Sequence, residues 1–157
     1  MLMMMFLAQV ADARPVLSLE GTGTVARMED DARNLGVGGG VRLGEQINLA
    51  ILDIIPEVGL SVWSCETVAA VARIGGRARV LAGIEPGVYA HAGYLLGEEA
   101  STGFDAGLLL DITLPRKWEI GAHAGVQAYG TSPTAVAGVH LGIKLGQSRA
   151  EKRAENR

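Results

Sequence analysis

The stretch from Lys117 to Leu145 alternates residue by residue between two kinds of side chain, interrupted at residues 130–133, Gly-Thr-Ser-Pro. The apolar positions are Trp118, Ile120, Ala122, Ala124, Val126, Ala128, Ala135, Ala137, Val139, Leu141, Ile143 and Leu145. The positions between them mostly carry glycine, imidazole, amide or charge. A period of two residues is the pattern of a β-strand, and the interruption consists of turn-forming residues. The stretch therefore predicts a β-hairpin with one continuous apolar face.

The same alternation recurs through the chain from residue 16 onward. It predicts six earlier strands, over residues 16–26, 35–44, 47–63, 68–82, 87–96 and 103–114. Tight connections are expected at Glu45–Gln46, Glu85–Pro86 and Pro115–Arg116, and they alternate with longer polar loops. Eight strands joined in this way predict an up-and-down antiparallel meander that closes into a barrel.

The third expected strand, residues 47–63, is the least regular. Ile47, Leu49 and Ile51 are apolar on the face that is otherwise polar, and Pro56 lies in the middle of the strand. Because proline has no backbone N–H to donate to a ladder, we expect a bulge or a local break at Pro56.

Alternation alone does not say which face points inward, because a soluble barrel has its apolar face inside and a membrane barrel has it outside. The apolar face carries more side chains than the interior of an eight-stranded barrel holds, which is on the order of a dozen or two. Many of the 22 glycines fall on the polar face, where a crowded interior needs them and a solvated surface does not.

Acidic and basic residues on the polar face nearly balance, as is required where each buried charge needs a partner. The fold predicted on these grounds is all-β, an eight-stranded antiparallel up-and-down transmembrane β-barrel with lipid outside and a polar, salt-bridged interior. The aromatic content of 4% is low for the interfacial girdles of such a barrel, with Tyr94, Phe104 and Trp118 as the candidates. The expected interior polar network comprises Glu20, Arg42, Asp53, Glu57, Arg73, Arg77, Arg79, His91, Asp105, Asp111, Glu119, His123, His140 and Lys144.

Composition narrows the functional classes. With 48% hydrophobic residues and a net charge of -3, the chain is neither disordered nor suited to binding nucleic acid. The single cysteine, Cys65, excludes an internal disulfide and offers no cluster with zinc-site spacing. Residues 1–13 resemble the end of a secretory signal peptide without its basic start, the alternative being an ordinary apolar segment. Residues 15–145 form the expected barrel domain, and residues 146–157 are a charged polar tail.

Few residues carry the signs of chemistry. His91, His123 and His140 are expected on the inner face, where a metal site would need them at one height with an acid such as Glu119. Histidines among buried carboxylates more often complete a hydrogen-bond network, so no metal, no cofactor and no catalytic residue is expected. Polar residues expected near the loop rim have no histidine beside them, which argues against an enzyme; they are Ser64, Glu66, Ser101 and Ser132.

The segments 55–61 (Ile-Pro-Glu-Val-Gly-Leu-Ser) and 85–94 (Glu-Pro-Gly-Val-Tyr-Ala-His-Ala-Gly-Tyr) look like strand segments of secreted bacterial barrels. Together with the last hairpin, they give the chain a resemblance to small eight-stranded outer-membrane β-barrel proteins of Gram-negative bacteria, the OmpA-like or porin-like group. The last expected strand ends in Leu145 where that group usually ends in an aromatic residue. The resemblance implies an outer-membrane location.

The function expected from the sequence is that of a small outer-membrane barrel with a structural or interaction role and no wide pore. Its surroundings would be outer-membrane lipid, with lipopolysaccharide among the candidates, and its polar loops would be the surface for a protein partner, whose identity the sequence does not give. The alternative is a soluble lipocalin-like β-barrel that binds an apolar ligand.

Overall fold

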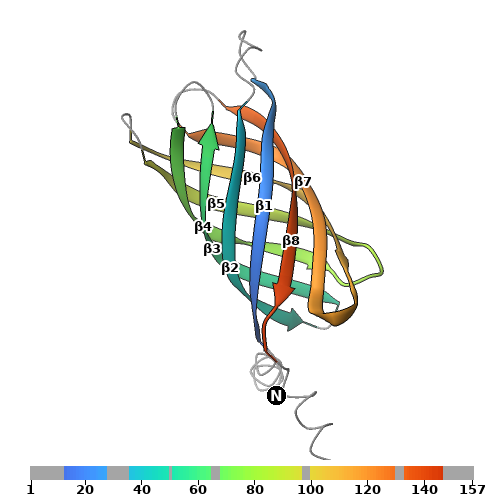
Figure 1. The fold of residues 1–157 in the computed structure, drawn as a ribbon. Helices are drawn as coiled ribbons and strands as arrows, with labels where there is room; N and C mark the ends of the chain where they lie inside the picture. The colour runs from blue at the N-terminus through green and yellow to red at the C-terminus, as the bar shows by residue number, and fades with distance from the viewer. Residues whose placement is uncertain are drawn as a thin grey trace, which may run out of the picture.

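The chain forms a closed barrel of eight antiparallel strands, each paired with its neighbours in sequence, and β1 also pairs with β8 (Figure 1). The computed structural model describes residues 13–27, 36–49, 51–64, 68–96, 100–129 and 133–146. The expected fold class is confirmed. The strands are β1 (Arg14–Arg27), β2 (Val37–Leu49), β3 (Leu52–Ser64), β4 (Val68–Val80), β5 (Glu85–Leu96), β6 (Ser101–Thr113), β7 (Trp118–Tyr129) and β8 (Thr134–Lys144).

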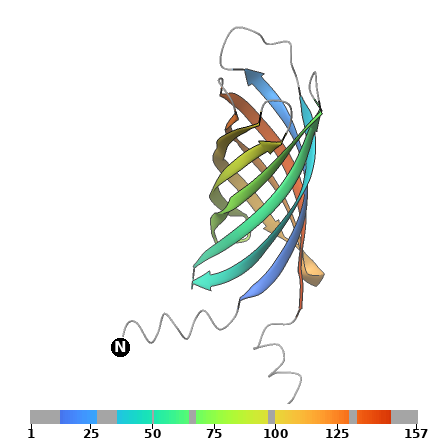
Figure 2. The ribbon, with the colours of Figure 1, turned by 90° about the vertical axis from the view of Figure 1, so that its left-hand side faces the viewer.

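The long strands are tilted and wind around the barrel (Figure 1), and the view turned by 90° shows the same tilt (Figure 2). Short connections join β2 to β3, β4 to β5 and β6 to β7 at one end, which we call the turn end; the opposite end is the loop end. No helix in the described part of the chain is long and apolar enough to cross a bilayer. Except for Ala13 and Gly146, the expected leader and tail fall outside the described residues.

Two of the three expected tight turns are wrong. β2 continues past Glu45–Gln46 to Leu49 and the chain turns at residues 50–51, so Ile47 and Leu49 simply extend the outward face of β2. The second turn lies at residues 81–84, and Glu85 is already the first, buried residue of β5. In both places the polar residues are of types common in turns, but they continue the inward and outward alternation of a strand, and they belong to the strand.

The third turn lies where it is expected. A short 3-10 helix, η2 (Pro115–Lys117), connects β6 to β7, and Lys117 adopts a left-handed conformation with φ of 71°. The Lys117 Nζ donates a hydrogen bond to the carbonyl oxygen of Gly146, which holds the turn against the end of β8.

No bulge occurs at Pro56. It pairs with Gly76 of β4 in an unbroken register, and its side chain points outward. The pairing of β2 with β3 lapses between Gly44↔Glu57 and Ile47↔Ile54 and resumes in the same register. The missing proline N–H therefore interrupts one ladder without displacing the strand.

The outer surface is a continuous apolar belt. Side chains in the middle of the strands are largely exposed, for example Leu108 at 68% and Ile74 at 65%. The six remaining strands also contribute exposed apolar side chains, including Leu19, Val41, Leu60, Val88, Ile120 and Val139. Soluble monomers rarely expose a contiguous apolar patch larger than a few hundred Å².

The interior has two tiers. Charged and polar side chains fill the barrel from the turn end to its middle, including Asp53, Arg79 and Glu119, each with no exposed area. Near the loop end the filling is apolar and aromatic, built from Trp63, Val71, Val136, Leu95 and Tyr129. The sequence predicts a polar filling alone, so this apolar tier is an addition.

Glycines on the inner face make room for the filling. At Gly121 an added Cβ would overlap the Asp111 carboxylate and the His140 ring, whereas at Gly21, on the outer face, it would meet nothing within 4 Å. We expect Gly121→Ala to lower the free energy of unfolding by about 1–3 kcal/mol through overpacking.

The matched control is Gly21→Ala, which we expect to leave stability unchanged or raise it by up to about 1 kcal/mol because alanine is less flexible than glycine in the unfolded chain. Urea unfolding of the refolded protein, followed by tryptophan fluorescence, measures both. Equal effects of the two substitutions would contradict the assignment of inner and outer faces.

Candidate functional site

Four carboxylates surround the guanidinium of Arg79 at the turn end of the interior. Its Nη1 lies 2.8 Å from Asp111 Oδ2 and 3.0 Å from Glu119 Oε2. Its Nε lies 3.2 Å from Glu85 Oε2 and 3.4 Å from Asp53 Oδ2. All five side chains are buried, so each charge depends on these contacts for compensation.

Glu57 organises the middle of the interior. Its Oε1 accepts hydrogen bonds from Arg42 Nη1 at 3.0 Å and from the His91 ring at 2.8 Å, and its Oε2 accepts one from Arg77 Nε at 3.0 Å. The other ring nitrogen of His91 lies 2.6 Å from Asp105 Oδ1. Only an imidazolium can donate from both ring nitrogens, so this geometry corresponds to a charged His91.

Arg73 and Arg42 extend these contacts toward β1. Arg73 Nη1 donates to Asp105 Oδ2 at 2.9 Å, and its Nη2 forms an ion pair with Glu20. Arg42 Nε lies 3.2 Å from the second oxygen of Glu20. Both carboxylate oxygens of Glu20 are therefore held by arginines.

Arg77 joins the two groups. Besides Glu57, its guanidinium lies 3.4 Å from Glu119 Oε1 and 3.3 Å from His140 Nε2, and that nitrogen is 3.1 Å from Asp111 Oδ1. The result is one connected network to which all eight strands contribute, with members Glu20, Arg42, Gln46, Asp53, Glu57, Arg73, Arg77, Arg79, Glu85, His91, Asp105, Asp111, Glu119 and His140.

Two residues expected in the network lie at its margin. His123 is half-buried and contacts rings: its centroid is 5.6 Å from that of Tyr89 and 6.3 Å from that of His140. Lys144 lies at the turn end and donates to Thr113 Oγ1 at 3.3 Å.

Gln46 and Glu85 are network members that were not predicted from the sequence, because both were expected in turns. Gln46 Nε2 donates to Asp53 Oδ2, and Glu85 contacts Arg79. The signal was present: Ile47 and Leu49 alternate with Gln46 and Asn48, which is the pattern of a continuing strand.

The three histidines do not gather with Glu119 in the way a metal site of that composition would require. In the described ranges, one group of possible ligands has its atoms within 4.8 Å of one another, namely Asp111, Glu119 and His140. Arg77 and Arg79 already place cationic groups against this set, and a divalent ion there would meet strong repulsion. Of the rim residues, Glu66 and Ser132 lie outside the described residues, as does Cys65.

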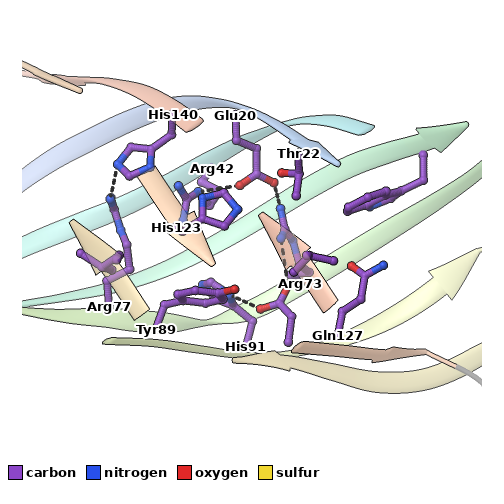
Figure 3. Close-up of a pocket in the computed structure, with 14 residues that line it drawn as sticks. Glu20, Thr22, Arg42, Arg73, Arg77, Tyr89, His91, His123, Gln127 and His140 are labelled. Carbon is purple, nitrogen blue, oxygen red and sulfur yellow. Dashed lines mark hydrogen bonds and ion pairs between the residues drawn. The ribbon is translucent and has the colours of Figure 1, made fainter. Parts of the chain in front are cut away.

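A small polar cavity lies between the network and the apolar tier (Figure 3). It offers about 10 Å³ to the centre of a water molecule and therefore has room for about one water. Figure 3 shows His123 between the Arg42–Glu20 pair and Tyr89, with Arg77 and His140 to its left. The cavity lining includes these residues together with Arg73, His91 and Asp105.

Solved structures share this architecture. The crystal structure of Ail, the attachment invasion locus protein of Yersinia pestis, matches with a TM-score of 0.55 at 9% identity, over 86% of this chain and 99% of that chain. Neisserial surface protein A, NspA, matches with a TM-score of 0.54 at 10% identity, over 85% of this chain and 97% of that one. The chain has the fold of small outer-membrane barrels.

A designed protein has the same fold. The solution structure of the de novo designed TMB2.3 matches with a TM-score of 0.50 at 14% identity, over 87% of this chain and 98% of that chain. No protein-family model matches the sequence, and no curated protein matches it. The recognised resemblance to the small outer-membrane barrel group is confirmed at the level of the fold.

Removing one member of the network should leave its buried partners without a compensating charge. We expect Arg77→Leu to lower the free energy of unfolding by about 3–5 kcal/mol, because the substitution leaves Glu57 and Glu119 buried with less compensation. The change is measured by denaturant titration, with the folded and unfolded protein quantified as separate bands on a gel. The control is Lys117→Leu at the turn end, where the hydrogen bond that is lost is exposed. A decrease in the free energy of unfolding below about half a kcal/mol for Arg77→Leu would place the Arg77 charge in solvent.

Proposed function

We propose that this protein is a small integral β-barrel of the bacterial outer membrane with a structural or interaction role. The observation that carries the proposal is the continuous apolar belt around a polar, ion-paired interior. Water would solvate the opposite arrangement, so the belt requires an apolar environment, and the lipid of a membrane supplies it. The fold shared with outer-membrane barrels supports the same location.

The interior argues for a structural role over transport. The connected network and the apolar tier occupy the lumen, and the cavity between them has room for about one water. A barrel filled in this way has no wide diffusion pore. Because the carboxylates of the network are engaged with arginines, and His91 and His140 with carboxylates, we propose that the protein is not an enzyme and binds no cofactor.

Contacts with other molecules fall to the outer surface and the loop end. The belt would contact outer-membrane lipid, with lipopolysaccharide as the candidate on the outer side, and the loops would present the surface for a protein partner. The soluble, lipocalin-like alternative is not favoured: ligand pockets usually span about 300–1,000 Å³ and are largely apolar, whereas the cavity in the described interior has room for about one water and is lined mainly by charged and polar side chains.

A charge on the outer face separates the membrane and soluble alternatives. In lipid vesicles we expect Leu108→Arg, in the middle of β6, to cost about 2–4 kcal/mol of unfolding free energy, because arginine near the bilayer midplane loses its hydration. Thr102→Arg, on the same face near the loop end, should cost about 0–1 kcal/mol. Effects within about half a kcal/mol for both variants would indicate a water-exposed surface.

Membrane fractionation of expressed full-length protein tests the location directly. We expect the protein in the outer-membrane fraction, with folded and heated samples migrating differently on gels after refolding into detergent. Recovery as a soluble monomer without detergent would refute the membrane proposal. Planar-bilayer recordings address the lumen separately: we expect no stable conductance steps of the size that open porins give.

A further inference from the structure

One carboxylate lies on the outer face of the barrel, near the turn-end border of the apolar belt. Glu45 is exposed and lies between Leu43 and Ile47 on the outward side of β2. Among the described side chains of the strands it is the only charged one on the outer face, and no ion pair joins it to another described residue. In contact with lipid, such a group needs a partner that lies outside the protein.

Glu45 lies at the edge of a groove across the outer faces of β2, β3 and β4. The groove offers about 450 Å³ to the centre of a water molecule, compared with about 10 Å³ in the interior cavity. Its apolar wall consists of Leu43, Val58 and Ile74, which lie directly opposite one another on the three strands. Glu57 also lines the groove, but arginines hold its carboxylate in the interior.

Small residues flank the carboxylate and make room beside it. Glu45 is opposite Pro15 of β1, and the register of β2 with β3 brings it opposite Pro56, where the ladder lapses. Pro56 is in turn opposite Gly76 of β4, which has no side chain. An apolar chain can therefore lie along the wall of the groove with its polar end at Glu45.

The level of Glu45 along the barrel matches that of a lipid head group. Glu45 lies four residues before Leu49, the end of β2, and is opposite the second residue of β1. At about 3.3 Å per residue and a tilt of about 40°, four residues correspond to roughly 10 Å along the barrel axis. The apolar wall lies on the side of Glu45 that is farther from the turn end. A lipid of the leaflet at the turn end has its head group and its acyl chains in the same order.

We propose that this groove binds a phospholipid with a primary ammonium head group, of the phosphatidylethanolamine class. The inference rests on the proposed membrane location. The ammonium group donates hydrogen bonds to the Glu45 carboxylate, and an acyl chain lies against Leu43, Val58 and Ile74. A choline head group has no N–H to donate, and an anionic head group is repelled. A second copy of the chain is a poorer occupant, because no described side chain on the outer face of the strands is basic.

Native mass spectrometry of protein taken from mixed vesicles tests the site. The protein is folded into vesicles of equal parts phosphatidylethanolamine, phosphatidylcholine and phosphatidylglycerol with identical acyl chains, and is then transferred into a mild detergent. We expect the wild type to retain phosphatidylethanolamine about three- to tenfold over phosphatidylcholine, as one charge-assisted hydrogen bond provides. Glu45→Gln should retain these two lipids equally, and Glu45→Lys should favour phosphatidylglycerol.

The matched control is Thr102→Val, which removes the polar group of another exposed residue on the outer face, near the loop end and away from the groove. It should keep the wild-type preference. A wild type without a lipid preference, or a preference that is unchanged in Glu45→Gln, would overturn the lipid site and leave the membrane location intact. Failure of the wild type to enter the vesicles would refute the membrane location and the site with it.

Discussion

The barrel depends on the compensation of charges that its own fold removes from water. Arg79 illustrates the constraint: its guanidinium is fully buried and four carboxylates from four other strands surround it. Isolated, any of these ions would carry a desolvation penalty of several kcal/mol. They depend on the arrangement of the strands, because a shift of one strand by one residue would turn the charges of that strand toward the outer face. The network therefore specifies the register as much as it fills the space.

Glycine and apolar residues complete this arrangement. Arginine side chains are large, and the neighbouring strands make room for them at glycines, such as Gly59 opposite Arg42 and Gly87 opposite Arg79. The apolar tier of Trp63, Val71 and Val136 then separates the ion pairs from the loop end. Because water is excluded on that side, the electrostatic attraction inside is stronger than it would be in a wetted channel.

The alternation in the sequence was sufficient to predict the strand number, the inward faces and the fold class, since each follows from a period of two. The pairing of charges was not predictable in the same way. Which acid meets which arginine depends on the stagger of strands around the barrel, which brings Arg77 of β4 to His140 of β8, distant in sequence. The prediction of turns at Glu45–Gln46 and Glu85–Pro86 was wrong because the polar residues that fill a barrel of this kind are of the same types as turn residues. The inward apolar residues Ile55 and Leu109 were missed because they carry no polar signal.

The lapse in the ladder at Pro56 has a consequence for local stability. Where backbone pairing between β2 and β3 is interrupted, the side chain of Gln46 reaches across to Asp53 and links the same two strands. This stretch of the wall is thus held by side chains in the lumen, while the rest of it is held mainly by main-chain hydrogen bonds. Amide protons of β2 and β3 next to the lapse would exchange with solvent deuterons sooner than those of the unbroken β3–β4 pairing, so the first local opening of the wall would begin there.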